Sequence, residues 1–109
     1  EGYLAEYHPD AAVVVLRSQI VGPFRNHEGI RRMLTEAFAI APDFNVEIDE
    51  IRDCGNGRVL LLGRQHATVR SVPFDQVLAE VYEIEDGKVA RMEAFPTIAR
   101  ALQAAGLSE

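Results

Sequence analysis

The feature that most constrains the fold is a run of strand-like segments joined by tight turns across residues 44–95, directly after one amphipathic helical segment. Apolar and polar residues alternate over Phe44–Asp49, which predicts a half-buried strand. Cys54–Gly57 and Glu85–Lys88 have the composition of hairpin turns. Because consecutive hairpins produce antiparallel neighbours, the sequence predicts an antiparallel sheet in chain order.

Three more strands complete this predicted meander. They are expected at Val59–Leu62, Val77–Ile84 and Val89–Phe95, with a turn near Ser71–Pro73 between the first two.

One long helix is predicted between Asn26 and Pro42. Asn26 is a favourable N-cap, and Glu28 places a negative charge in the first turn, where it stabilises a helix. Apolar residues then recur at helical spacing, at Ile30, Met33, Leu34, Ala37 and Phe38. Since this stripe needs a packing partner, we expect the sheet to curve around the helix and leave a pocket between them.

Shorter elements are predicted near both ends of the sequence. Tyr3–Tyr7 has the character of a final helical turn, which His8–Asp10 would stop because residues before proline disfavour helical geometry. Ala12–Leu16 is typical of a strand. Thr97 can cap a last helix that ends at Gly106. The predicted fold class is therefore α+β.

Composition supports one globular domain over residues 1–109, because 48% hydrophobic residues are enough to fill a single core. The net charge of -6 argues against nucleic acid and anionic membranes as partners. The one cysteine, Cys54, cannot form an internal disulfide and fits a cytoplasmic location. The three histidines lack the spacing of metal ligands, so neither a metal nor a cofactor is expected.

A polar cluster is predicted on two neighbouring strands. If their hairpin pivots at Val72, Arg64 lies opposite Glu80 and His66 lies beside this pair. In an apolar pocket, Glu80 would be the acid–base group and Arg64 its partner or an anion stabiliser. His66 would transfer a second proton, and Tyr82 would donate a hydrogen bond. The alternative is a solvated, weakly stabilising surface ion pair.

The other face of these strands is predicted to form an apolar outer patch. Its members are Val59, Leu61, Val77, Ala79 and Val81. Because an exposed patch of this kind favours association, we expect either a homodimer joined through the outer sheet face or loops that cover it.

Several short motifs, in their order and spacing, resemble the SnoaL-like family of the nuclear transport factor 2-like superfamily. They are His8–Asp10, Gly22–Arg32, Pro42–Phe44, Asp86–Val89 and Ala101–Leu107. The resemblance covers nearly the whole chain and implies a cone-shaped α+β barrel with a deep pocket, usually in a homodimer. It also implies helices before the position of His8. Since only Glu1–Tyr7 precede it, we expect either that the N-terminal helix is truncated or missing, or that the cone is partly open and closed by a partner chain.

The resemblance leaves the activity open, because the superfamily includes isomerases, cyclases, epoxide hydrolases, dehydratases and binding modules. Val15 stands where isomerase-like enzymes have a catalytic Asp, and Ala94 stands where SnoaL-like cyclases have one. Glu80 matches the acid of an isomerase-like oxyanion hole. Arg64–His66 matches an epoxide-hydrolase-like Arg-x-Asp with its Asp replaced.

We therefore predict a pocket for a small apolar molecule. Its expected lining includes Val15, Phe38, Leu62, Leu78, Ile84, Met92 and Ala94. The protein would be a lyase, isomerase or hydrolase that uses acid–base chemistry at Glu80, Arg64 and His66, or else a non-catalytic ligand-binding or dimerisation module. A third reading is a structural domain whose hollow is filled by its own side chains.

Overall fold

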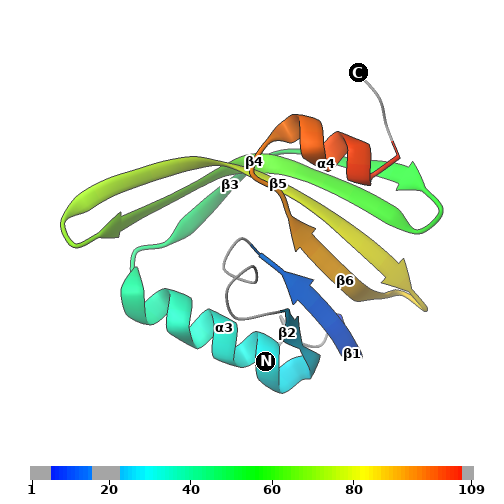
Figure 1. Ribbon diagram of the computed structural model, residues 1–109, viewed down its shortest axis with the longest axis horizontal. Helices are drawn as coiled ribbons and strands as arrows, with labels where there is room; N and C mark the ends of the chain where they lie inside the picture. Colours follow the sequence, from blue (N-terminus) through cyan, green and yellow to red (C-terminus); the bar gives the residue numbers. More distant parts are fainter. Residues whose placement is uncertain (1–5, 16–22, 107–109) are drawn as a thin grey trace.

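The computed structural model describes residues 6–15 and 23–106, which form a curved six-stranded sheet with helices on both sides (Figure 1). The elements are β1 (Tyr7–Val14), β2 (Phe24–Arg25), α3 (Asn26–Ile40), β3 (Asn45–Gly55), β4 (Arg58–Val69), β5 (Val72–Glu85), β6 (Lys88–Ala94) and α4 (Ile98–Ala104). Residues 1–5, 16–22 and 107–109 lie outside the described residues (Figure 1), and with them most of the helical turn predicted at Tyr3–Tyr7 and the end of the first predicted strand.

The strand order is β2-β1-β6-β5-β4-β3. The β6-β5-β4-β3 part is antiparallel, as predicted, whereas β1 runs parallel to β6. The α+β class is confirmed, with a mixed sheet that curves but does not close. In the described part of the chain, neither helix is long and apolar enough to cross a membrane.

Helix α3 begins where the sequence predicts. Arg25 occupies the N-cap position, and Asn26, the predicted cap, is the first residue of the helix. The side-chain oxygen of Asn26 still accepts a hydrogen bond from the backbone N–H of Gly29 at 3.1 Å, which satisfies one of the free N–H groups of the first turn. Ile30 is fully buried in a core that includes Val13 on β1 and Met92 on β6. The first turns of α3 are thus held against the sheet.

The first described strand begins earlier than predicted. Tyr7 is 2% exposed and lies in β1 rather than at a helix end, and His8–Asp10 continue that strand. The pairing of β1 with β6 shifts between Tyr7 and Ala12. Pro9 falls in this irregularity, where the missing N–H of a proline is tolerated. The prediction that His8–Asp10 stop a helix is therefore wrong.

The β4–β5 hairpin has a different register from the predicted one. Its two-residue turn is at residues 70–71, both of which have positive φ, rather than at Val72. Arg64 consequently lies opposite Val77 and not opposite Glu80. The observed register differs from the predicted one by an odd number of residues. Side chains that were expected to share one face of the sheet therefore lie on opposite faces. The predicted Arg64–Glu80 ion pair is wrong.

Helix α4 covers part of the convex face of the sheet. Thr97 caps it as predicted, accepting a hydrogen bond from the backbone N–H of Arg100 at 3.2 Å. Ala101 packs on Leu60, and both are fully buried. This contact forms a second hydrophobic core on the side of the sheet opposite to α3.

The predicted outer patch is divided by the observed register. Ala79 and Val81 are buried in the core beneath α4, with Val77 packed at its edge. Val59 and Leu61 alternate onto the concave face instead. The apolar part of the outer face is thus covered in part by the chain's own last helix.

Strand β3 is an edge of the sheet, and nearly all of its residues are exposed. Its pairing with β4 shifts between Ile48 and Glu50. Gly63 lies opposite this irregularity, and a Cβ atom there would collide with the backbone carbonyl oxygen of Glu47. Only glycine fits where the two backbones approach so closely.

Candidate functional site

A cavity of about 960 Å³ lies between α3 and the concave face of the sheet. Pockets for small molecules typically have volumes of about 300–1,000 Å³, so this one can hold a ligand of several rings. Its lining is mostly aliphatic and aromatic. The rings of Phe38 and Phe44 meet edge to face with centroids 5.9 Å apart, at the corner where α3 leads into β3.

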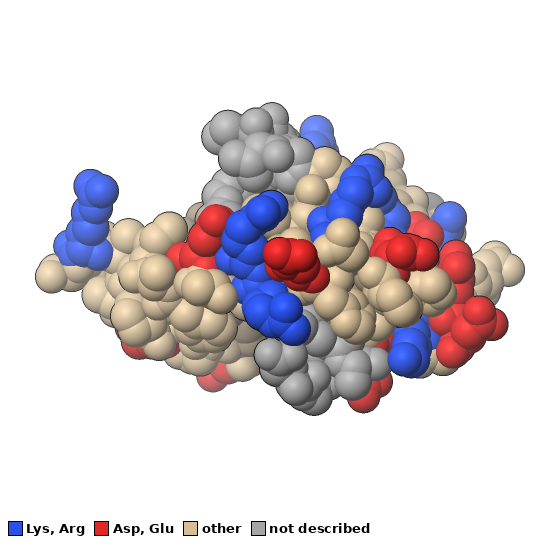
Figure 2. Space-filling model, turned by 90° about the horizontal axis from the view of Figure 1, so that it is seen from below, with Lys and Arg blue, Asp and Glu red and all other residues tan. Residues whose placement is uncertain are grey.

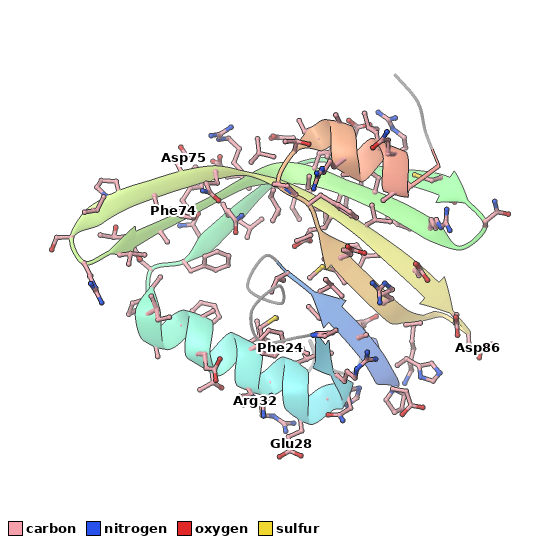
Figure 3. All side chains as sticks on the ribbon, viewed as in Figure 1. Phe24, Glu28, Arg32, Phe74, Asp75 and Asp86 are labelled. Carbon is pink, nitrogen blue, oxygen red and sulfur yellow. The ribbon has the colours of Figure 1, made fainter. Side chains whose placement is uncertain are left out.

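The exposed part of the cavity lining, which we call the mouth, lies on the adjoining ends of β3, β4 and β5, which we call the arm, and on the end of α3 that faces them. It is mostly apolar and includes one exposed amide, Gln76. Large apolar side chains of the lining remain exposed there: Phe38 (46%), Val46 (40%), Ile48 (55%) and Phe74 (37%). Figure 3 shows Phe74 on the α3 side of the arm and Asp75 on the other side. Seen from below, the surface under the arm is largely free of charged residues (Figure 2).

The principal polar feature of the cavity is a carboxyl–phenol pair. Glu80 and Tyr82 lie two residues apart on β5 and therefore share its concave face. The hydroxyl of Tyr82 donates a hydrogen bond of 2.7 Å to Oε1 of Glu80. Burial raises the pKa of Glu80, and the hydrogen bond from Tyr82 partly opposes that increase. Such a carboxyl group can donate a hydrogen bond when protonated and accept a proton when ionised.

The structure places most of the predicted lining residues at this cavity. Those that line it are Val15, Phe38, Leu78, Met92 and Ala94. Two others do not. Leu62 packs against the core beneath α4, and Ile84 lies outside the lining. The difference for Leu62 follows from the register of β4, which turns the even-numbered residues of that strand outward.

Arg64 and His66 lie on the opposite face of the sheet from Glu80. Nε of Arg64 donates to Oδ1 of Asp75 at 2.8 Å. The ring of His66 lies between two carboxylates, with Nε2 3.1 Å from Oε1 of Glu47 and Nδ1 3.5 Å from Oδ2 of Asp75. Of the four predicted catalytic residues, the structure therefore brings only Glu80 and Tyr82 together in the cavity.

The other two histidines make local contacts. Nε2 of His27 donates to the backbone carbonyl oxygen of Tyr7 at 2.8 Å, which ties α3 to β1. Nδ1 of His8 accepts a hydrogen bond from the backbone N–H of Asp10 at 3.4 Å. Across residues 6–15 and 23–106, no group of three or more His, Cys, Asp or Glu side chains could hold a metal ion.

Sequence reasoning missed a second polar pair in the cavity lining. Gln65 on β4 lies directly opposite Gln76 on β5, and both line the cavity. Gln65 shares a strand face with Leu61 and Ala67 and could have been identified as the polar residue of that face, whereas Gln76 stands next to Asp75 and has no such local signal. Their pairing depends on the turn at residues 70–71, however, and Arg-Ser carries none of the Gly or Asn signals that locate such a turn.

Comparison with known proteins identifies the family to which this chain belongs. The model of the SnoaL-like domain matches residues 1–92. A search of curated proteins found no match. Among solved structures, an NTF2-like protein of unknown function from Burkholderia pseudomallei is 18% identical, with a TM-score of 0.77 over 94% of this chain and 81% of its own.

Two further solved structures have the same fold. TerC, co-crystallised with polyporic acid, is 20% identical, with a TM-score of 0.77 over 96% of this chain and 84% of its own. IdmH from Streptomyces antibioticus, proposed to be a polyketide cyclase, is 17% identical, with a TM-score of 0.69 over 94% of this chain and 84% of its own. The family model and these shared folds together establish that the chain belongs to the SnoaL-like domain family, with an NTF2-like fold.

Proposed function

We propose that this protein binds a small, largely apolar molecule between α3 and the concave face of the sheet, and that Glu80 exchanges a proton with it. The observation that carries the proposal is a partly buried carboxyl group with a raised pKa, held by Tyr82 and facing an apolar cavity. Raising the pKa of a carboxyl group brings it toward the range that general acid–base catalysis uses, and such groups are concentrated at functional sites. The reaction class would be a lyase, an isomerase or a hydrolase.

The structural neighbours support a small-molecule ligand. One was crystallised with polyporic acid, and another is proposed to be a polyketide cyclase. At their low identity to this chain they support the class of ligand and not a particular compound.

The second candidate function is binding without catalysis. It is favoured by the composition of the cavity, in which Glu80 is the one Asp, Glu, His, Lys or Arg among the described lining residues. Val15 and Ala94 provide no acid at the two positions where the family resemblance implies one. A reaction that needs a separate acid and base would have to use Tyr82 or the substrate itself.

Binding can be tested with Nile red, an uncharged dye whose fluorescence rises in apolar surroundings. We expect wild-type protein to bind the dye and the Ala37→Trp variant, which fills the cavity from α3, to lose most of that binding. Gln103→Trp, at an exposed position of α4 on the other side of the sheet, is the control and should bind normally. Equal binding by the wild type and Ala37→Trp would contradict the proposed pocket.

Catalysis can be tested by screening epoxides, enones and hydroxy ketones for turnover by the wild type and by Glu80→Gln. An enzyme of the proposed kind would lose its pH-dependent rate in the variant while still binding Nile red. A rate that Glu80→Gln leaves unchanged would remove Glu80 from the mechanism. The absence of turnover, together with retained dye binding, would favour the binding module.

We also propose a homodimer and a cytoplasmic location. A homodimer joined through the outer sheet face would have to use surface beyond the residues that α4 covers, such as the region around Asp75. Native mass spectrometry would test it. The cytoplasmic location would be tested by cell fractionation.

A further inference from the structure

The polar groups of the cavity lining are not scattered but lie in two pairs. One is Glu80 with Tyr82, joined by the 2.7 Å hydrogen bond. The other is Gln65 with Gln76, which lie directly opposite each other on neighbouring strands. Directly opposed side chains have Cβ atoms about 4.5–5.5 Å apart, so both amides can reach a single ligand atom.

The amide pair has unused hydrogen-bonding capacity. The side chain of Gln65 makes one long contact, from Nε2 to the backbone carbonyl oxygen of Val77 at 3.5 Å. The side chain of Gln76 is exposed at the mouth, and within the described ranges it has no hydrogen-bond partner in the protein. A ligand atom at the mouth could therefore be held by both amides.

The spacing of the two pairs is fixed by β5. Gln76 and Glu80 are four residues apart on one strand and face the same side. At about 3.3 Å per residue, their Cα atoms are roughly 13 Å apart, and side chains on the concave side of a curved sheet converge from that value. Between the two pairs, the lining is apolar, with Leu78 opposite Gly63 in the intervening row and Leu61 directly opposite Glu80.

The charge of the lining also restricts the ligand. No Lys, Arg or His lies among the described residues of the cavity wall, and its one carboxyl group is Glu80. An anionic ligand would lose its hydration without gaining a counter-charge, which is unfavourable in an apolar site.

We infer that the ligand is an uncharged, elongated molecule with an oxygen atom near each end, one bound by Glu80 and Tyr82 and the other by Gln65 and Gln76. This inference rests on the proposed function, because it assumes that the cavity is a ligand site. It assigns Gln65 and Gln76 the role of specificity residues that measure ligand length.

The test uses a series of rigid probes that differ only at their ends. The probes are biphenyl, para-hydroxybiphenyl, para,para′-dihydroxybiphenyl and para-phenylbenzoate, titrated against wild-type protein by calorimetry or Nile red displacement. The diphenol should bind roughly tenfold more tightly than the monophenol, the effect of about one net hydrogen bond. The benzoate should bind more weakly than the monophenol, which has a similar size but no charge.

The decisive variant is Gln65→Leu combined with Gln76→Leu. We expect it to bind the monophenol as the wild type does and to lose the roughly tenfold advantage of the diphenol. Gln103→Leu, an equivalent change on α4 outside this cavity, should leave both affinities unchanged. The unaltered monophenol affinity also shows that the double variant is folded.

The outcomes separate the inference from the function on which it rests. If the wild type binds monophenol and diphenol equally, or if the double variant retains the preference, the two-point inference is wrong while the pocket stands. A double variant that weakens every probe equally would also contradict it, because the amides would then act only as part of the wall. If no probe binds the wild type, both the inference and the proposed pocket fail.

Discussion

Burial of Glu80 in the cavity wall disfavours its charged form, and the same burial gives the carboxyl group the properties on which the proposed function rests. Its carboxyl group is partly buried among apolar side chains, and burial raises its pKa because the charged form loses hydration. The hydrogen bond from Tyr82 compensates for only part of that loss. The proposed role of Glu80 toward a ligand is consistent with this arrangement, because carboxyl groups with shifted pKa values are concentrated at functional sites.

The raised pKa of Glu80 gives a pH dependence of stability with a definite sign. The folded state holds this proton more tightly than the unfolded state does, so the contribution of Glu80 is fully present below pH 4.5 and is lost as pH rises through its higher folded pKa. As pH rises through this range, we expect the free energy of unfolding of Glu80→Gln to increase relative to that of the wild type. Urea denaturation of both proteins across the pH range would measure the difference.

Asp43 supplies a control of opposite sign. The backbone N–H of Thr68 donates to its carboxylate at 2.9 Å and lowers the pKa of Asp43 below 3.8. Its contribution is therefore present above that value and is lost in acid. Asp43→Asn should be less stable than the wild type above that pH, and the difference in free energy of unfolding should shrink as pH falls. For Glu80→Gln, a difference in free energy of unfolding from the wild type that did not grow with pH would contradict the assignment of a buried carboxyl group.

Neighbouring leucines on β4 offer a residue-scale test of the register. Leu60 is fully buried beneath α4, whereas Leu61 is partly buried beside the open cavity. Leu60→Ala should lower the free energy of unfolding by roughly 2–5 kcal/mol, and Leu61→Ala by about 1–2 kcal/mol because fewer contacts are lost. Chemical denaturation would measure both. Equal costs, or a larger cost at Leu61, would show that α4 covers the other face of this strand.

At the scale of elements, the close approach of β3 to β4 makes one glycine indispensable. A methyl group at position 63 would collide with the carbonyl oxygen of Glu47, so the strands would have to separate at the irregularity in their pairing. We expect Gly63→Ala to lower the free energy of unfolding by about 1–3 kcal/mol.

The matched control for that change is Gly29→Ala in α3. A Cβ atom at position 29 would have its nearest neighbour at 3.5 Å, an ordinary contact, and alanine favours helical geometry more than glycine does. This variant should therefore gain stability, by up to about 1 kcal/mol. Thermal denaturation of both variants would test the pair, and a neutral effect of Gly63→Ala would mean that the two strands separate easily.

The elements were largely predictable from sequence, whereas their relative register was not. The start of α3 carries its own local signal in Asn26, and the turn at Asn56–Gly57 carries one as well. The turn at residues 70–71 has no such signal. Because Pro73 is a residue typical of turns, the turn was predicted too far along the chain, at Val72. Because a strand exposes alternate residues, that one error moved Arg64 and Leu62 to the wrong face of the sheet.

At the scale of the whole molecule, the cavity leaves apolar surface uncovered that a ligand could bury. A ligand that binds only the folded state stabilises it by mass action, by about 2.7 kcal/mol at a concentration a hundredfold above its Kd. For a chain of this size, we expect Tm to rise by roughly 10–20 °C with para,para′-dihydroxybiphenyl at that concentration. Differential scanning calorimetry would measure it, with the Ala37→Trp variant as the control that should show little change.

The exposed edge strand β3 has a consequence for how a sample of this protein should be kept. The charged residues of this strand are mainly acidic: Glu47, Asp49 and Asp53 stand beside one ion pair, Glu50 with Arg52. Two such edges should repel one another in dilute buffer, because charged edge strands resist edge-to-edge pairing with another chain. Salt near 1 M shortens the screening length to about 3 Å and removes this protection. Concentrated stocks should therefore stay clear in low-salt buffer and turn cloudy in high salt, so the choice of storage buffer decides the shelf life of the protein.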